Sequence, residues 1–170
     1  MRRISALGRT LASGQKVPVD IVRDGVEIWQ KYADRMLDVH VGQFVAARTV
    51  LPHTEECRLP LIELQDEPTQ SAARLNEVRT LLDGYAVHPG LYQALLGNVL
   101  IGLATSELAW AGFEGDFANS CLPMHLSDTA LAQWRTALIE TELQIDQTRV
   151  LLQAFLERSK EYAWPDPATK

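Results

Sequence analysis

Residues 127–164 read SDTALAQWRTALIETELQIDQTRVLLQAFLERSKEYAW, and this stretch decides the fold. Its apolar and small residues recur in alternating steps of three and four, which is the spacing of one helix face. That face, the seam, consists of Leu131, Trp134, Leu138, Thr141, Ile145, Thr148, Leu152, Phe155, Ser159 and Tyr162. Ser127 suits the N-cap, and Asp128 the first turn. A seven-residue repeat held over this length predicts a long helix that packs along a partner helix.

The partner helix is predicted over residues 20–51, where the same rhythm occurs. Its seam comprises Val22, Val26, Trp29, Ala33, Met36, His40, Gln43, Ala47 and Val50. Asp20 suits the start of this helix, and Pro52 ends it because proline disfavours helical geometry in the residue before it. The two long helices are expected to pair, in either a parallel or an antiparallel orientation.

Two shorter helices complete the prediction, over residues 68–85 and 89–113. The second is apolar almost all round, which predicts a buried central helix. Residues 53–66 are expected to form a connector because of Pro52 and Pro60, and residues 114–126 a loop because they are rich in Gly, Asp, Asn and Pro. The fold class is therefore all-α, a four-helix-type bundle over residues 17–164, with a basic arm at 1–16 and a tail at 165–170.

The charge is unevenly distributed along the 170 residues. The whole chain carries −6, and residues 1–16 carry +4 from Arg2, Arg3, Arg9 and Lys16, which leaves −10 for the rest. An acidic body repels phosphate, so no nucleic-acid partner is expected. The arm lacks a continuous apolar segment, so we expect no secretory signal and a cytoplasmic chain or one held within a protein assembly.

One apolar stretch, Leu91–Phe113, has the character of a membrane span. Glu107 lies within it, and an intramembrane carboxylate is costly, so we expect a core helix rather than a span. Such a carboxylate needs a partner in the core, and an arginine such as Arg74 or Arg149 would supply it. The two cysteines, Cys57 and Cys121, show no metal-ligand spacing and are expected to be buried or half-buried thiols, although the sequence leaves a disulfide open.

The four histidines, His40, His53, His88 and His125, show no metal-binding spacing, so no metal site and no cofactor are expected. Arg48-Thr-Val-Leu-Pro-His53 resembles the Arg-x4-His motif of the helical HEPN ribonucleases over these six residues. This resemblance implies an alternative in which Arg48 and His53 act together on a phosphodiester. A second alternative is a small-ligand or regulatory bundle, with a cavity beside the small residues Gly102 and Ser106.

A second apolar stripe lies on the last helix, away from its seam. It consists of Ile139, Leu143, Val150 and Ala154, and we call these four residues the outer stripe. Either the short helices or another protein chain is expected to cover it. Together with Trp164 and with Arg2 and Arg3 of the arm, it is the predicted partner-binding surface.

The favoured function is accordingly a non-catalytic structural or scaffolding subunit that self-associates or binds protein partners. A component of a virus particle or of a secretion machine is an example of such a subunit.

Overall fold

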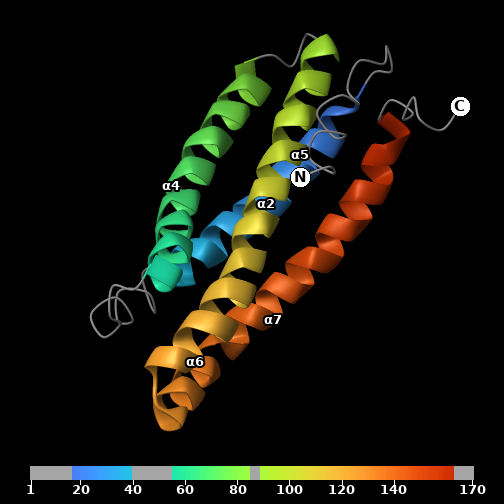
Figure 1. Cartoon of the computed structure of the whole chain (residues 1–170). Helices are drawn as coiled ribbons and strands as arrows, with labels where there is room; N and C mark the ends of the chain where they lie inside the picture. Colours follow the sequence, from blue (N-terminus) through green and yellow to red (C-terminus); the bar gives the residue numbers. More distant parts are fainter. Residues whose placement is uncertain (1–16, 40–54, 85–88, 163–170) are drawn as a thin grey trace, which may run out of the picture.

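The computed structural model describes residues 17–39, 55–84 and 89–162, with side chains described from Asp66 in the second helix and from Leu91 in the third. Four long helices pack against one another, and the described part of the chain contains no strand (Figure 1). The elements are α2 (Val19–Val39), α4 (Glu55–Gly84), α5 (Pro89–Gly112), the π-helix η2 (Phe113–Cys121), α6 (Leu122–His125), α7 (Asp128–Ser159) and the 3-10 helix η3 (Lys160–Tyr162). The all-α bundle predicted from the sequence is confirmed.

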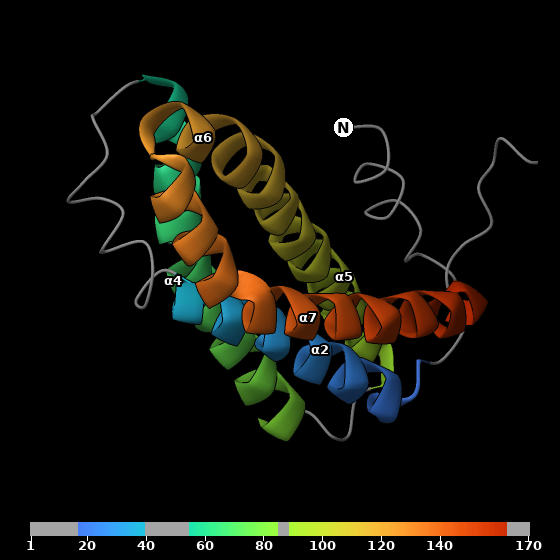
Figure 2. The same ribbon diagram turned by 90° about the horizontal axis from the view of Figure 1, so that it is seen from below.

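Helix α2 lies at the centre of this bundle, since it contacts α4, α5 and α7. Figure 2 shows α7 lying beside α2, with α4 and α5 on the other sides. The described part of its seam is buried as expected, from Val22 to Met36. We predicted the 89–113 helix to be central, but α5 leaves Ile101 and Leu108 exposed. Helix α2 is the central helix instead, because buried residues occupy more of its circumference.

Helices α2 and α7 run antiparallel, which settles the orientation that the sequence left open. Arg158 near the end of α7 pairs with Asp24 near the start of α2, with 2.7 Å between Nη2 and Oδ2. Phe155 packs against Gly25 at the same level, where the glycine lets the two backbones approach closely. All ten seam residues of α7 are buried or half-buried. The predicted seam is therefore confirmed along α7.

Helix α4 begins at Glu55, so the connector predicted over residues 53–66 is wrong from residue 55 onward. The prediction treated Pro60 as a break, whereas it lies inside the helix. An interior proline removes one helical hydrogen bond, and packing of the helix can offset that cost. Here α4 contacts α2, α5 and η2, and its residues Glu67 and Pro68 are buried.

Residues 113–125 are helical, so the loop predicted over 114–126 is wrong except near its end. Phe113, Phe117 and Cys121 recur every four residues and are buried, while the loop-favouring residues between them lie on the outside. Ser120 Oγ donates to the carbonyl of Gly115, five residues earlier, at 3.1 Å. The loop-like composition was misleading because it belongs to the exposed side of a helix.

Cys121 is buried, as expected, but it is disulfide-bonded rather than a thiol. The side chain of Cys57 lies outside the described residues.

The N-cap prediction for α7 is confirmed, because the Ser127 side chain accepts a hydrogen bond from the backbone N–H of Ala130 at 3.3 Å.

One helical stretch in the described part, Leu91–His125, is long and apolar enough to cross a membrane. Half of its most apolar window is buried within the bundle. The inner face of α5, including Leu95, Val99 and Leu103, packs into the common core. The core helix of a bundle has this same composition, so the apolar character of α5 follows from its packing.

Candidate functional site

The outer stripe of α7 is exposed. Ile139 is 60% exposed, Leu143 56% and Val150 70%, and Ala154 is exposed as well. Helix geometry places all four on the side of α7 opposite its seam. The backbone of α7 lies closest to α2, α6 and η3, and its side chains reach α5 and η2 from sides other than the outer stripe. Of the two coverings expected from the sequence, the short helices α4 and α5 are thus excluded.

The charges along Asp128–Tyr162 are mainly acidic, with six carboxylates and four basic side chains. Three of these bases form ion pairs: Arg149 with Glu107, Glu114 and Asp146, Arg158 with Asp24, and Lys160 with Glu157. Among the described residues, this leaves Asp128, Glu140, Glu142 and Glu161 without an ion pair, and Arg135 is the base without one. Glu140 and Glu142 adjoin the outer stripe and Arg135 lies one turn before Ile139, so the borders of this apolar strip carry more acid than base.

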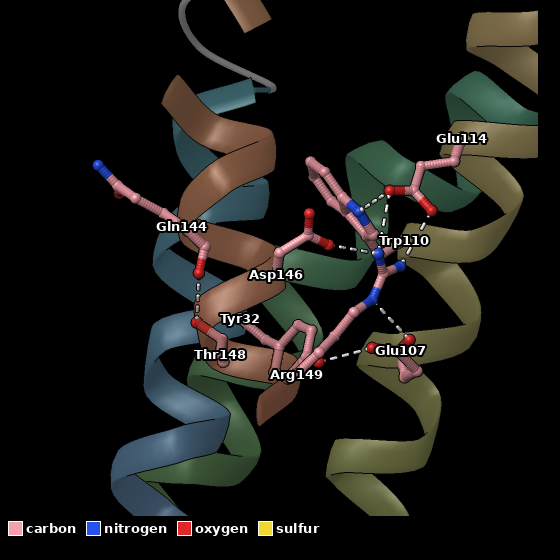
Figure 3. Close-up of polar contacts among 8 residues, drawn as sticks. All are labelled: Tyr32, Glu107, Trp110, Glu114, Gln144, Asp146, Thr148 and Arg149. Carbon is pink, nitrogen blue, oxygen red and sulfur yellow. Dashed lines mark hydrogen bonds and ion pairs between the residues drawn. The ribbon is translucent and has the colours of Figure 1, made fainter. Parts of the chain in front are cut away.

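Arg149, on the α5-facing side of α7, is the main tie between α7 and α5 (Figure 3). Its Nε lies 3.0 Å from Glu107 Oε1, and its Nη2 and Nη1 lie 3.0 and 3.2 Å from the two oxygens of Glu114. A third carboxylate, Asp146, lies 3.1 Å from Nη1. The predicted pairing of Glu107 with an arginine is confirmed for Arg149, although Glu107 is half-buried rather than buried.

Two further donors complete this network. The Tyr32 hydroxyl donates to Glu107 Oε2 at 2.6 Å, and Trp110 Nε1 donates to Glu114 Oε1 at 2.8 Å. Burial, the hydrogen bond to Glu107 and the charge of Glu107 all raise the pKa of Tyr32. Burial lowers the pKa of Arg149, but the hydrogen bonds to Glu114 and the charge of Glu107 outweigh it and raise the pKa overall.

These contacts occupy every carboxylate oxygen of Glu107 and Glu114. Together they tie α7 to α2, α5 and η2 through Arg149 and its two carboxylate partners.

A second polar cluster lies inside the bundle, around Glu67. This side chain is 6% exposed, and its Oε1 accepts hydrogen bonds from Ser71 Oγ at 2.5 Å and Ser106 Oγ at 2.6 Å. Trp29 Nε1 donates to Ser71 Oγ at 3.2 Å. Glu67 Oε2 has no hydrogen-bond partner among the described residues. Both hydroxyls are themselves buried, so no substrate reaches them, and the cluster is a part of the core.

Sequence reasoning missed this cluster because it began the second helix at residue 68, which left Glu67 outside any predicted helix. A usable signal was present: Glu67, Ser71, Leu75, Val78 and Leu82 continue one helix face in steps of four and three. All five are buried on α4.

The space beside Gly102, where a ligand cavity was one alternative, is filled by the Trp29 indole. A Cβ atom added at Gly102 would lie 2.2 Å from Trp29 Cζ2. Ser106, one turn further along α5, is fully buried and hydrogen-bonded to Glu67. The small residues of α5 therefore serve close helix packing at this point.

The remaining predicted site residues, Arg2, Arg3, Arg48, His53 and Trp164, lie outside the described residues, as does the first helix beyond Val39. In the part of the chain that the structure describes, no group of three histidine, cysteine or acidic side chains is arranged to hold a metal ion. No family model, no curated protein and no solved structure matches this chain.

Proposed function

We propose that this chain is a non-catalytic structural subunit that assembles with further copies of itself through the outer face of α7. The observation that supports this proposal is the outer stripe, whose three large aliphatic side chains are 56–70% exposed on the side opposite a fully used seam. The seam already packs α7 onto α2, so the fold of one chain does not need a second apolar face. A row of exposed aliphatic side chains bordered by charge is typical of a protein-interaction surface.

The stripe has the dimensions of a helix-binding surface. From Ile139 to Ala154 it extends about 22 Å along α7 at the standard helical rise. Full burial of an aliphatic side chain stabilises a complex by about 1.5–3 kcal/mol, so Ile139, Leu143 and Val150 together supply several kcal/mol to an interface. The bordering carboxylates Glu140, Glu142 and Glu161 would form the polar rim that surrounds such a centre.

The test compares self-association of the native chain with that of a stripe variant, Leu143→Asp with Val150→Asp, by sedimentation equilibrium. We expect the native chain to associate, and the stripe variant to do so at least about 100-fold more weakly, because two carboxylates would then be buried at the contact. A matched control is Leu108→Asp, which places the same charge at a 57% exposed leucine on the outer face of α5.

The control variant should associate like the native chain. All three proteins should show the same far-UV circular dichroism, because the substituted side chains lie at the surface. Equal association by the stripe variant and the native chain would contradict the proposal.

A further inference from the structure

We infer that the outer stripe of one copy binds the basic segment 1–16 of a second copy, an inference that rests on the proposed self-assembly. The stripe requires a partner with an apolar face and basic borders, because its own borders are acidic. Segment 1–16 has both properties. It carries four bases and no acid, and Ile4, Leu7 and Leu11 recur in steps of three and four, the spacing of one helix face.

The lengths of the two surfaces agree. As a helix, the run from Ile4 to Leu11 spans about 10 Å, the same as the distance along α7 from Leu143 to Val150. An amphipathic helix that lays its apolar side chains on such a strip is a common mode of recognition. Its basic side chains would then lie near the carboxylates that border the strip.

A symmetric contact between two α7 helices fits the charges less well. Such a contact places the same surface opposite itself, so the acidic borders of one stripe would face the acidic borders of the other. Asp146 lies between Leu143 and Val150 on this face, and it would approach its counterpart. Like charges brought together at an interface are costly. A basic segment avoids this repulsion, which favours it as the occupant.

The reach of the segment favours a second copy over the same chain. The pair Arg158–Asp24 sets the antiparallel register of α7 and α2. Val17 lies seven residues before Asp24, and Ile139 lies nineteen residues before Arg158, which separates Val17 from Ile139 by about 39 Å along the bundle.

The stretch from Val17 back to Ile4 is too short to cross that separation. The six residues from Val17 back to Leu11 span at most about 20 Å when extended, and a helix from Leu11 to Ile4 adds about 10 Å. Leu11 therefore falls short of Val150 in its own chain, because Val150 lies about 22 Å from Val17 along the bundle even before the path around α7 is counted. The arm of a second copy has no such tether.

A contact of this kind joins two different surfaces, the arm of one copy and the stripe of the next. Every copy retains a free arm or a free stripe unless a ring closes, so the contact generates rings or open chains of subunits. This property distinguishes it from a simple symmetric dimer, and it allows the two surfaces to be tested separately.

The experiment uses two full-length variants, the stripe variant (Leu143→Asp with Val150→Asp) and an arm variant (Leu7→Asp with Leu11→Asp). Each loses one of the two surfaces and keeps the other. We expect each variant alone to be monomeric and their mixture to form a one-to-one complex, as detected by native mass spectrometry. The complex should also dissociate more readily at high salt, since opposite charges line the contact.

The other outcomes overturn the inference in distinguishable ways. An arm variant that assembles as well as the native chain would show that another surface fills the stripe, and the proposed self-assembly would stand. A mixture that stays monomeric would reject the contact between arm and stripe. A native chain that is itself monomeric would overturn both the inference and the proposed function. If the native chain is monomeric but the arm variant assembles, the arm of the native chain covers the stripe of its own chain.

Discussion

The packing of α5 on α2 leaves no room for a side chain at Gly102. In an exposed helix interior, replacing glycine with alanine stabilises by about 0.5–1 kcal/mol. At Gly102 the new Cβ would lie 2.2 Å from a ring atom of Trp29, whose indole is 1% exposed and hydrogen-bonded to Ser71. We therefore expect Gly102→Ala to lower the free energy of unfolding by about 1–3 kcal/mol, as overpacking does.

The matched control for this prediction is Gly112→Ala, where an added Cβ meets nothing within 4 Å. This variant should be as stable as the native chain or slightly more stable. Urea unfolding followed by circular dichroism compares the two. Equal effects of the two substitutions would contradict the close approach of Trp29 to Gly102.

Tyr32 makes the stability depend on pH in the alkaline range. Its pKa is raised above the ordinary value of 10 by burial and by Glu107, so the folded chain keeps the phenol proton where the unfolded chain releases it. The contribution of Tyr32 is fully present below pH 10 and is lost as the pH rises further, by about 1.4 kcal/mol per pH unit. Tyr32→Phe removes this ionisation and the hydrogen bond to Glu107.

We expect Tyr32→Phe to be less stable than the native chain at pH 8 by about 1–2 kcal/mol, the value of a lost hydrogen bond to a charged group. The difference should shrink between pH 10 and pH 11, because only the native chain has this phenol to ionise. Urea unfolding at the three pH values measures it. A difference that does not change with pH would show that Tyr32 is not protected in the folded state.

At the scale of residues, the sequence predicted a contact correctly where a charged side chain stood in an apolar environment. A carboxylate on an apolar helix needs a cation, and Glu107 indeed pairs with Arg149. The spacing of Glu67 and Ser71 along α4 marked Glu67 as inward-facing, but its other partners, Ser106 and Trp29, come from α5 and α2. No local pattern contains those partners.

Among the elements, α7 depends on one side chain for its attachment to α5. Arg149 is 29% exposed and meets three carboxylates, whereas Arg158 is 52% exposed and meets only Asp24. Replacing Arg149 with methionine keeps the apolar stem and leaves the half-buried Glu107 and Glu114 without their cation. We expect Arg149→Met to cost about 1–2 kcal/mol of stability, since partial exposure reduces the cost of breaking a buried pair.

Arg158→Met is the control, because an exposed pair contributes about 0.5 kcal/mol or less. Hydrogen exchange adds a local measurement: protection should fall in α7 near Arg149 and remain unchanged in α4. If the two variants lose the same stability, the network around Arg149 contributes no more than an ordinary surface pair.

The π-helix η2 is held by the disulfide of Cys121 in addition to its buried aromatic residues. Phe113 and Phe117 contact each other and Trp134, which joins η2 to α7. Loss of a native disulfide typically costs about 2–5 kcal/mol. We therefore expect Cys121→Ser to destabilise the oxidised chain by that amount and to leave the reduced chain little changed.

Peptide mapping checks the redox state directly. Protein denatured without reductant should show no alkylation at Cys121. A fully alkylated Cys121 would contradict the disulfide. A confirmed disulfide would also bear on the expected cytoplasmic location, because disulfides persist mainly in oxidising compartments.

The predictability of the elements followed the strength of their periodicity. The seam of α7 repeats over nine steps without a break, and all of its residues proved buried or half-buried. The start of α4 and the helical course of η2 were missed because proline, glycine and asparagine were read as breaks. In both segments, contacts with distant helices override the local preference for a turn.

For the whole molecule, the outer stripe is the feature that the fold of one chain leaves unexplained. The sequence predicted this stripe but left open whether the short helices or another protein chain would cover it. The positions of α4 and α5 exclude the short helices. What remains is a chain with a well-packed core and an exposed apolar face. Self-assembly is the function that this combination supports best, and the arm and stripe of successive copies provide a specific geometry for it.

The most direct test is the molar mass of the native full-length chain in solution, measured by light scattering over a concentration series. One chain has a mass of 19.0 kDa. Self-assembly through the outer stripe predicts that the measured mass rises above this value with concentration. A mass that stays at 19.0 kDa over the whole series would contradict the account.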